Sequence, residues 1–220
     1  MVFIVVPAYN EEKQIGRVVR GLFEQGFDKI IVVDDGSADK TVGEAAAAGA
    51  VVLSHSLNRG QGAALQTGDE YALAQGAGKI VHFDADGQFN PADIAPALKI
   101  MADRNLAVVF GSRFLDGRSK VPWLKRNIIL PISRFVNWLL TGIYLSDAHN
   151  GFRILSRQAA EKVVITQDGM AHNSEIVALV KKLNLPFAEV PVEVKYFEFG
   201  QGPLGGFKII KDLFIGKLSK

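Results

Sequence analysis

Apolar runs alternate with amphipathic segments along the first half of the chain. Residues 2–7 are continuously apolar, as expected of a strand that is covered on both faces. Residues 11–25 place apolar side chains on one helical face, and Asn10 precedes them as a predicted cap. By the same criteria, strands are predicted at 29–33, 51–53, 79–83, 106–110 and 187–196, and helices after Asp39, within 60–75, at 91–104 and from about 170.

This alternation predicts an α/β fold. Strands separated by helices form a mainly parallel sheet between two helical layers, so we predict a three-layer α/β/α sandwich. The chain has 220 residues, of which 48% are hydrophobic, and it contains no internal repeat or linker-like segment. One domain over 1–220 is therefore expected.

Polar segments follow five of the predicted strands, where ligands bind in such a sheet. They lie at 7–11, 34–35, 58–60, 84–86 and 111–113. Turns need the same Asp, Asn, Gly and Ser residues, so turn chemistry explains each segment alone. Their convergence at one edge of the sheet favours a binding site.

The segment after 79–83 carries two carboxylates, Asp84 and Asp86, followed by the permissive Gly87. Carboxylates this close repel, so one takes up a proton or a cation neutralises both. Mg²⁺ or Mn²⁺ suits such ligands and usually keeps positions open for phosphate oxygens. The turn is predicted to form half of a metal site whose other half is a nucleotide. The alternative is a solvated acidic turn.

Two other segments suggest nucleotide contacts. Asp34 or Asp35 could accept a hydrogen bond from a base N–H or a ribose hydroxyl, since Gly36 permits a close approach. Residues 58–64 contain Gly-x-Gly before a helix, but Leu65 replaces the third glycine of a dinucleotide motif. We expect this loop to pack on the nucleotide side, with Arg59 near phosphate.

Charge and composition argue against several classes. The net charge of +2 gives no general case for binding nucleic acid, and the absence of cysteine excludes disulfides and thiolate metal sites while agreeing with a cytoplasmic location. Residues 1–7 lack a signal-peptide pattern. The longest apolar region, 121–145, is interrupted by charged residues, which argues against a transmembrane span.

Two later segments combine basic and apolar residues. From Arg113 to Arg134, six basic residues accompany a single acidic one, Asp116, and the tail 207–220 repeats this chemistry. Such segments suit the interface of an anionic bilayer, although core helices with a solvated basic face explain them equally. Together they favour peripheral membrane contact.

Six motifs occur in a fixed order along the chain. They are Pro-Ala-Tyr-Asn-Glu at 7–11, Val-Asp-Asp-Gly-Ser at 33–37, the glycine-containing segment 58–68, Asp-Ala-Asp-Gly-Gln at 84–88, Gly-Ser-Arg-Phe at 111–114 and Asp-Ala-His-Asn-Gly-Phe-Arg at 147–153. This order resembles family 2 glycosyltransferases of the GT-A fold, and most closely the branch of dolichol- or polyprenyl-phosphate sugar transferases. The resemblance implies a nucleoside diphosphate sugar donor and inversion at the anomeric centre. It also implies a nucleotide-sugar half, 1–112, and an acceptor half, 113–220.

The resemblance implies roles for individual residues. Pro7, Tyr9, Glu11 and Asp35 would line the nucleoside pocket, and with the residue-based candidates Asp34 and Arg59 and with Asp84 they make up the expected donor-binding set. Asp84 would lie towards the ribose and metal, while Asp86 and Gln88 would ligate the cation that holds the diphosphate. Arg113 would face the acceptor.

Residues 147–153 resemble the acceptor-side motif of the family, in which Arg153 would pair with a carboxylate or meet phosphate. Glu175 matches a position that faces the active site. A hydroxyl acceptor would need a general base, for which Asp147, Glu175 and His172 are the candidates. A lipid phosphate is already ionised and needs none.

One stretch departs from the dolichol-type pattern. Those enzymes carry basic residues around an Arg…Gly-Ser-Lys stretch, whereas 197–204 reads FEFGQGPL, a glycine-containing run suited to a mobile lid. This departure counts against a polyprenyl phosphate acceptor. The overall resemblance still makes it the leading hypothesis, and a glycan or glycolipid hydroxyl in polysaccharide synthesis is the alternative.

We predict a metal-dependent inverting glycosyltransferase that uses a UDP- or GDP-sugar at the cytoplasmic membrane face. The expected partners are the donor, a lipid-linked or glycan acceptor, an anionic membrane surface and a small integral-membrane protein. A sugar-phosphate nucleotidyltransferase shares the nucleotide-binding sheet, but it would be expected to carry a glycine-rich, basic triphosphate loop after the first strand. This chain has Pro-Ala-Tyr-Asn-Glu there, at 7–11, which argues against that class. A non-enzymatic nucleotide-sugar sensor or scaffold is the alternative of another class.

Overall fold

The computed structural model describes residues 1–119, 138–139, 141–147 and 150–195. Its strands are β1 Val2–Ala8, β2 Ile30–Asp34, β3 Val51–Ser54, β4 Lys79–His82, β5 Val108–Ser112, β6 Arg153–Ser156 and β7 Phe187–Pro191. Its helices are α1 Ile15–Glu24, α2 Thr41–Ala47, α3 Gln61–Ala74, the 3₁₀ helix η1 Pro91–Asp93, α4 Ile94–Asp103, α6 Arg157–Ala160 and α7 His172–Lys182.

The described strands form one sheet in the order β3-β2-β1-β4-β6-β5-β7. β6 is antiparallel to both of its neighbours, and the other pairs are parallel, which confirms the predicted mainly parallel sheet. As a result, the carboxyl ends of the six remaining strands meet at one edge. The predicted convergence of polar segments is therefore confirmed.

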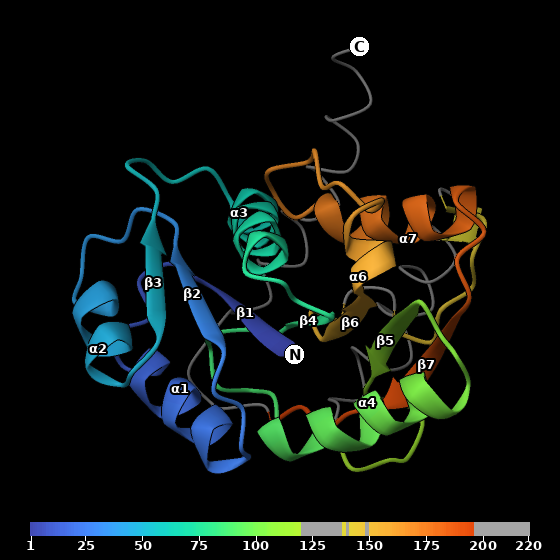
Figure 1. Cartoon of the computed structure of the whole chain (residues 1–220), viewed down its shortest axis with the longest axis horizontal. Helices are drawn as coiled ribbons and strands as arrows, with labels where there is room; N and C mark the ends of the chain where they lie inside the picture. The colour runs from blue at the N-terminus through green and yellow to red at the C-terminus, as the bar shows by residue number, and fades with distance from the viewer. Residues whose placement is uncertain (120–137, 140, 148–149, 196–220) are drawn as a thin grey trace, which may run out of the picture.

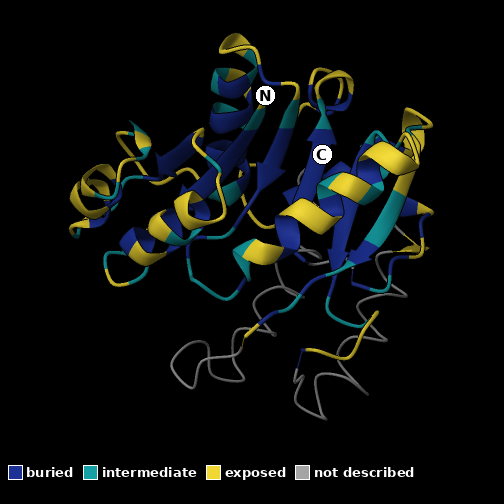
Figure 2. Ribbon diagram, turned by 60° about the horizontal axis from the view of Figure 1, so that its bottom comes forward, coloured by how far each residue is buried: buried dark blue, intermediate teal, exposed yellow. Residues whose placement is uncertain are grey.

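Helices cover both faces of the sheet, as predicted (Figure 1). Helices α1, α2 and α4 pack on one face and α3, α6 and α7 on the other, and each face has its own apolar core. Ile4 and Val6 of β1 contribute to the first core, and Phe3 and Val5 contribute to the second. Because successive strand residues point to opposite faces, two cores explain the uninterrupted apolar runs. Figure 2 shows the buried strands between helices whose outer faces are exposed.

The loop after β1 corrects the predicted start of the first helix. α1 begins at Ile15, not at residue 11, and Asn10 does not cap it. Asn10 adopts a left-handed conformation with φ of +55°, which asparagine tolerates better than most residues. Its Oδ1 accepts a hydrogen bond from the N–H of Ala38 at 3.0 Å, and its own N–H donates to Ser37 Oγ at 2.9 Å. The segment before α1 is thus fastened to the loop after β2.

Two other predicted caps lie at helix starts. Asn90 Oδ1 accepts from the N–H of Ala92 at 3.1 Å, which confirms this cap. Asp39 Oδ1 accepts from the N–H of Thr41 at 2.9 Å, although the N-cap position of α2 is Lys40.

The second half of the sheet departs from the sequence prediction. β5 spans Val108–Ser112 instead of 106–110, β7 ends at Pro191, and the antiparallel β6 was not expected. The pairing of β5 with β7 extends to Ser112 and Pro191, beyond which Val194 forms an isolated antiparallel bridge with Phe89. The chain therefore leaves the sheet before the predicted strand end.

The predicted membrane segments are only partly described. Most of 113–134, and all of 197–204 and 207–220, lie outside the described residues. In the described part of the chain, no helix has the length and apolar character needed to cross a bilayer.

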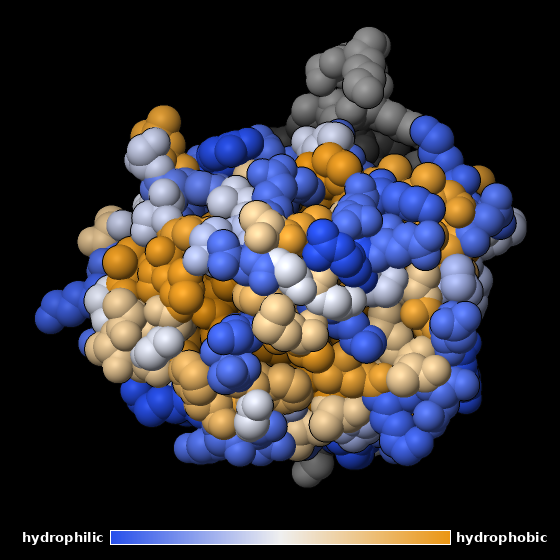
Figure 3. Space-filling view, in the orientation of Figure 1, coloured by the Kyte–Doolittle hydropathy of each residue, from blue (hydrophilic) through white to orange (hydrophobic). Residues whose placement is uncertain are grey.

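On the face seen in Figure 3, apolar residues gather around the region of β2 and β3.

Candidate active site

A cavity of about 460 Å³ lies at the carboxyl edge of the sheet. Six of the predicted site residues line it, namely Pro7, Tyr9, Glu11, Asp35, Asp84 and Asp86. The other lining residues are Ala8, Asn58, Gly60, Gln61, Ala64, Ala85 and Met170. The predicted residues Asp34, Arg59, Gln88, Arg113, Asp147 and Glu175 lie outside this lining.

Acidic groups in the cavity are held in an unfavourable electrostatic environment. Burial, supplemented by the charge of Asp86, raises the pKa of Asp84 to about 7. Burial also raises the pKa of Asp86, and burial with the charges of Asp86 and Asp39 raises that of Glu11. Carboxylates that resist ionisation because of burial, and in the case of Asp84 and Glu11 also because of the charge of Asp86, would be stabilised by a bound cation.

The oxygen donors of this turn suit a hard divalent cation. Asp86 Oδ1 accepts a hydrogen bond from the N–H of Gln88 at 2.9 Å, which fixes the turn, and Asp84 lies two residues after the end of β4. Within the described residues, no group of three or more His, Cys, Asp or Glu side chains converges on one point. The Asp84 and Asp86 carboxylates at the cavity supply oxygen donors, which are the ligands that suit a cation such as Mg²⁺ or Mn²⁺ sharing its coordination with ligand phosphate.

Asp84 is also fixed from two other segments. Gln61 Nε2, at the start of α3, donates to Asp84 Oδ1 at 2.9 Å. Gly151 packs directly on the same carboxylate, since a Cβ built there would stand 2.3 Å from Asp84 Oδ2. Only glycine fits this position without displacing the carboxylate. The segment that contains Gly151 and the acidic turn are consequently in direct contact.

Asp35 supports the cavity wall. Its carboxylate accepts from the N–H groups of Arg59 at 2.9 Å and Gly60 at 2.6 Å, and it bonds His55 Nδ1 at 2.8 Å. Asp34 is bonded locally instead, accepting from the N–H of Ser37 at 3.3 Å. Asp35 thus holds the loop before α3 against the edge of the sheet.

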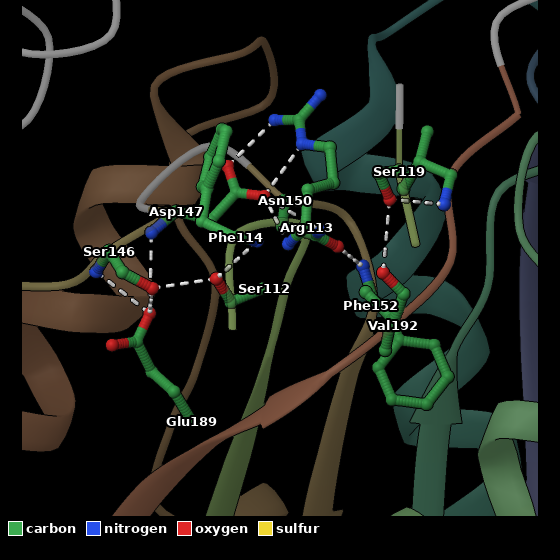
Figure 4. Close-up of polar contacts among 11 residues, drawn as sticks. Ser112, Arg113, Phe114, Ser119, Ser146, Asp147, Asn150, Phe152, Glu189 and Val192 are labelled. Carbon is green, nitrogen blue, oxygen red and sulfur yellow. Dashed lines mark hydrogen bonds and ion pairs between the residues drawn. The ribbon is translucent and has the colours of Figure 1, made fainter. Parts of the chain in front are cut away.

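Arg113 and Asp147 form a bidentate ion pair beyond the end of β5 (Figure 4). Arg113 Nε donates to Asp147 Oδ2 at 2.6 Å and Nη2 donates to Oδ1 at 2.7 Å. The N–H of Arg113 and Asn150 Nδ2 also donate to Asp147 Oδ2. The Asp147 carboxylate is therefore committed to protein donors, and it fixes the orientation of the guanidinium.

Arg153 lies at the amino end of β6 and is 1% exposed. Its Nη2 donates to Asn173 Oδ1, whereas Nε and Nη1 have no hydrogen-bond partner among the described residues. Burial lowers its pKa to about 10, opposed by the charges of Asp84, Asp147 and Asp69. Its bonded partner is an amide and not the expected carboxylate, and its positive charge acts on the nearby Asp84, where it opposes the rise in pKa.

The family model for glycosyl transferase family 2 matches residues 3–164. The chain belongs to this family. It is therefore a glycosyltransferase, and the predicted family and GT-A fold are confirmed.

Named relatives agree with the predicted branch. A UDP-N-acetylglucosamine–dolichyl-phosphate N-acetylglucosaminyltransferase from Methanococcus voltae is 33% identical, over 100% of this chain and 97% of the relative. The polyprenol monophosphomannose synthase of Mycolicibacterium smegmatis is 28% identical, over 96% of this chain and 83% of its own length. The resemblance to polyprenyl-phosphate sugar transferases is thereby confirmed.

Solved structures share the fold. Glucosyl-3-phosphoglycerate synthase from Mycobacterium tuberculosis, in complex with phosphoglyceric acid, superposes with a TM-score of 0.72 at 20% identity, covering 97% of this chain and 78% of that one. The same enzyme in complex with Mn²⁺ and UDP-glucose gives a TM-score of 0.70 at 20% identity, with the same coverage.

Some site residues of this glycosyltransferase were not predicted. Glu189 on β7 accepts through Oε1 from the N–H of Ser146 at 2.8 Å, from its hydroxyl at 2.7 Å and from the N–H of Asp147 at 3.2 Å. Ser146 Oγ lies 2.6 Å from Ser112 Oγ. These contacts join segments that are far apart in sequence, so no local motif reveals them.

Gln61 and Met170 were missed for different reasons. Gln61 falls inside the recognised glycine-containing segment, and its position at the helix start could have suggested a contact with the acidic turn. Met170 precedes α7 in an otherwise polar stretch, and nothing in its surroundings marks it as a cavity residue.

Proposed function

We propose that this glycosyltransferase moves a sugar, with inversion, from a UDP- or GDP-sugar to a polyprenyl phosphate at the cytoplasmic face of a membrane. The observation that carries the donor half is the pair Asp84 and Asp86 at the cavity, where burial raises both pKa values and the charge of Asp86 raises that of Asp84 further. The acceptor is inferred from the relatives that are named for dolichyl or polyprenyl phosphate.

Asp84, Asp86 and Gln88 would hold a divalent cation. When bound, such a cation supplies positive charge that stabilises the departing diphosphate. Tyr9 and Glu11 would contact the nucleoside from the β1 side of the cavity. An acceptor phosphate oxygen attacks the anomeric carbon as the bond to the diphosphate breaks, and the nucleoside diphosphate leaves. Arg113, oriented by Asp147, would attract the acceptor phosphate.

The surroundings of the three candidate bases favour a phosphate acceptor over a hydroxyl, because none of the three side chains is well suited to accept a proton. Asp147 accepts from Arg113 and Asn150, and Glu175 accepts from Thr166 and Gln167. Burial and the charge of Arg153 lower the pKa of the third candidate, His172, to about 3. An acceptor that arrives ionised requires no base, which agrees with these engaged side chains.

Turnover tests this proposal. Purified protein is incubated with Mn²⁺, a panel of UDP- and GDP-sugars, and polyprenyl phosphate in mixed micelles, and the lipid fraction is analysed by mass spectrometry. We expect one polyprenyl-phospho-sugar whose formation requires the divalent cation. If no sugar reaches the lipid while a glycan acceptor is modified, the acceptor assignment is wrong; if no sugar is transferred or hydrolysed at all, the nucleotide-sugar scaffold becomes the better explanation.

Membrane association is tested separately. Flotation with vesicles containing anionic lipid should recover the protein in the lipid fraction, and less of it with neutral vesicles or high salt. Recovery in the soluble fraction under all conditions would contradict the peripheral location and remove the argument for a small integral-membrane partner.

A further inference from the structure

Residues 166–170, which we name the strap, lie against the amino end of α3. The carbonyl oxygen of Asp168 accepts from the N–H groups of Gly62 at 2.8 Å and Ala63 at 3.3 Å. The first N–H groups of a helix have no partner within the helix. The strap therefore caps α3 at the end that borders the cavity.

Two glycines make this contact possible. Gly60 has a φ of +112°, and a Cβ built there would stand 2.3 Å from the Asp168 carbonyl oxygen. A Cβ on Gly62 would stand 2.0 Å from the Gln167 carbonyl oxygen. Backbone atoms cannot move aside as the end of a flexible side chain can. The Gly-x-Gly pattern of this segment thus serves close approach of the strap.

The first turn of α7 holds the strap in place. The carboxylate of Glu175 accepts from the N–H of Thr166 at 3.0 Å, from the Thr166 hydroxyl, and from the N–H of Gln167 at 2.9 Å. His172 Nδ1 bonds the carbonyl oxygen of Gly169 at 2.8 Å. Because this ring nitrogen meets a carbonyl, it carries the proton and donates. Both ends of the strap are therefore bound to one helix.

The strap ends at the cavity. Met170 lines the cavity and is 49% exposed, close to the 50% of Tyr9, which also lines it. The side chain of Gln61, directly after Gly60, bonds Asp84. The strap is thus in contact with the helix end that supports the acidic turn, and it adds a flexible thioether to the wall.

We propose that the strap forms part of the donor-binding wall, with Met170 contacting the nucleoside diphosphate sugar and Glu175 acting as a positioning residue through the strap. This inference rests on the proposed function. A thioether adapts to apolar and aromatic surfaces, which suits packing against the nucleoside, at its base or its ribose ring. The carboxylate of Glu175 is occupied by strap donors and does not take the acceptor proton.

Calorimetric titration of UDP and GDP in the presence of Mn²⁺ tests the contact residue. Met170→Ala should weaken binding about fivefold or more. Val164→Ala is the matched control, because Val164 is also 49% exposed and does not line the cavity. It should bind like wild type. Both changes remove exposed apolar atoms, so the fold should survive in each.

Steady-state kinetics test the positioning residue. Glu175→Ala should raise the donor KM about tenfold and leave the pH profile of kcat unchanged, and Glu175→Gln should restore part of the loss because its amide oxygen still accepts. Glu161→Ala, which removes a surface ion pair with Arg157, is the control for loss of a carboxylate. A general base would instead lower kcat and eliminate one limb of its pH profile.

The outcomes are distinguishable. Wild-type protein that binds neither UDP nor GDP overturns the proposed function and the strap inference with it. Wild-type binding that is unchanged by Met170→Ala and Glu175→Ala overturns the strap inference alone. A loss confined to kcat in Glu175→Ala assigns Glu175 to proton transfer and likewise overturns its positioning role.

Discussion

Two acidic residues on the proposed donor side of the carboxyl edge, Asp84 and Asp86, bind fewer protein donors than Asp147 on the proposed acceptor side. On the donor side, Asp84 accepts from Gln61, and Asp86 accepts from the N–H of Gln88, while their pKa values are raised. On the acceptor side, Asp147 accepts four hydrogen bonds from Arg113 and Asn150.

This difference suits two roles: Asp84 and Asp86 are available to a ligand, whereas Asp147 supports the surrounding structure. A carboxylate whose oxygens are filled by protein donors fixes the fold around it, whereas the buried acidic pair at the cavity would be completed by a cation and phosphate under the proposed function. Acidic residues of one type thus serve two purposes within the same edge of the sheet. The following substitutions test whether the two sides respond as differently as their contacts indicate.

The largest effect is expected at Asp86. Asp86→Ala should reduce sugar transfer about 100-fold or more, because the charge that develops on the leaving diphosphate loses its stabilisation. The rate is measured with saturating Mn²⁺ and donor, and far-ultraviolet circular dichroism verifies the fold. Asp103→Ala, which removes an exposed carboxylate paired with Lys99, is the control and should retain the wild-type rate. Near-normal transfer by Asp86→Ala would place the cation elsewhere.

A somewhat smaller effect, a loss of nucleotide affinity, is expected at Gly151, which contacts the Asp84 carboxylate. Gly151→Ala introduces a Cβ at the Asp84 carboxylate and should weaken Mn²⁺-dependent binding of UDP or GDP about tenfold or more. Gly43→Ala is the matched control, since a Cβ there meets nothing within 4 Å and alanine favours the helix. Equal affinity in both variants would show that Asp84 tolerates displacement.

The same chemical change should have opposite effects on stability at the two sides. Asp147→Asn should lower the free energy of unfolding by about 3 kcal/mol, because it leaves the largely buried Arg113 without its charge partner. Asp86→Asn should leave it unchanged or raise it, since burial disfavours the ionised form of Asp86. Urea unfolding without divalent cations measures both values. Similar losses at the two positions would contradict the comparison.

The smallest effect concerns His172 and pH. Its pKa is about 3 in the folded chain and about 6.5 when unfolded, so below pH 6.5 the unfolded state binds more protons. Stability should therefore fall on acidification by up to about 1.4 kcal/mol per pH unit. His172→Asn keeps a donor for Gly169 and should show a shallower decline in urea unfolding between pH 7 and pH 5. Parallel declines would indicate that His172 is protonated in the fold.

The architecture was largely predictable from the sequence because apolar periodicity is a local property. Apolar runs such as 2–7 predicted the strands, and the cap at Asn90 predicted a helix start. The order of strands and helices then predicted the edge of the sheet at which ligands bind. The antiparallel β6 was missed because it interrupts the strand–helix alternation that supported the prediction. The start of α1 was misplaced because Asn10 bonds Ala38, a contact that only the folded chain creates.

The site was predictable where residues lie at strand ends and not where they act through distant partners. Tyr9, Asp84 and Asp86 line the cavity as expected. Asp147 and Glu175 were considered as bases because sequence reveals a carboxylate but not the donors that surround it. Those donors come from other segments and become visible only in three dimensions.

Calorimetric titration of UDP and GDP into wild-type protein and Asp86→Ala, with and without Mn²⁺, tests the central claim most directly. The donor-side carboxylates are proposed to form the cation site, so Mn²⁺ should strengthen wild-type binding of one nucleotide at least tenfold and have no such effect on the variant. Wild-type affinity that is the same with and without Mn²⁺, or an equal gain in Asp86→Ala, would contradict the account.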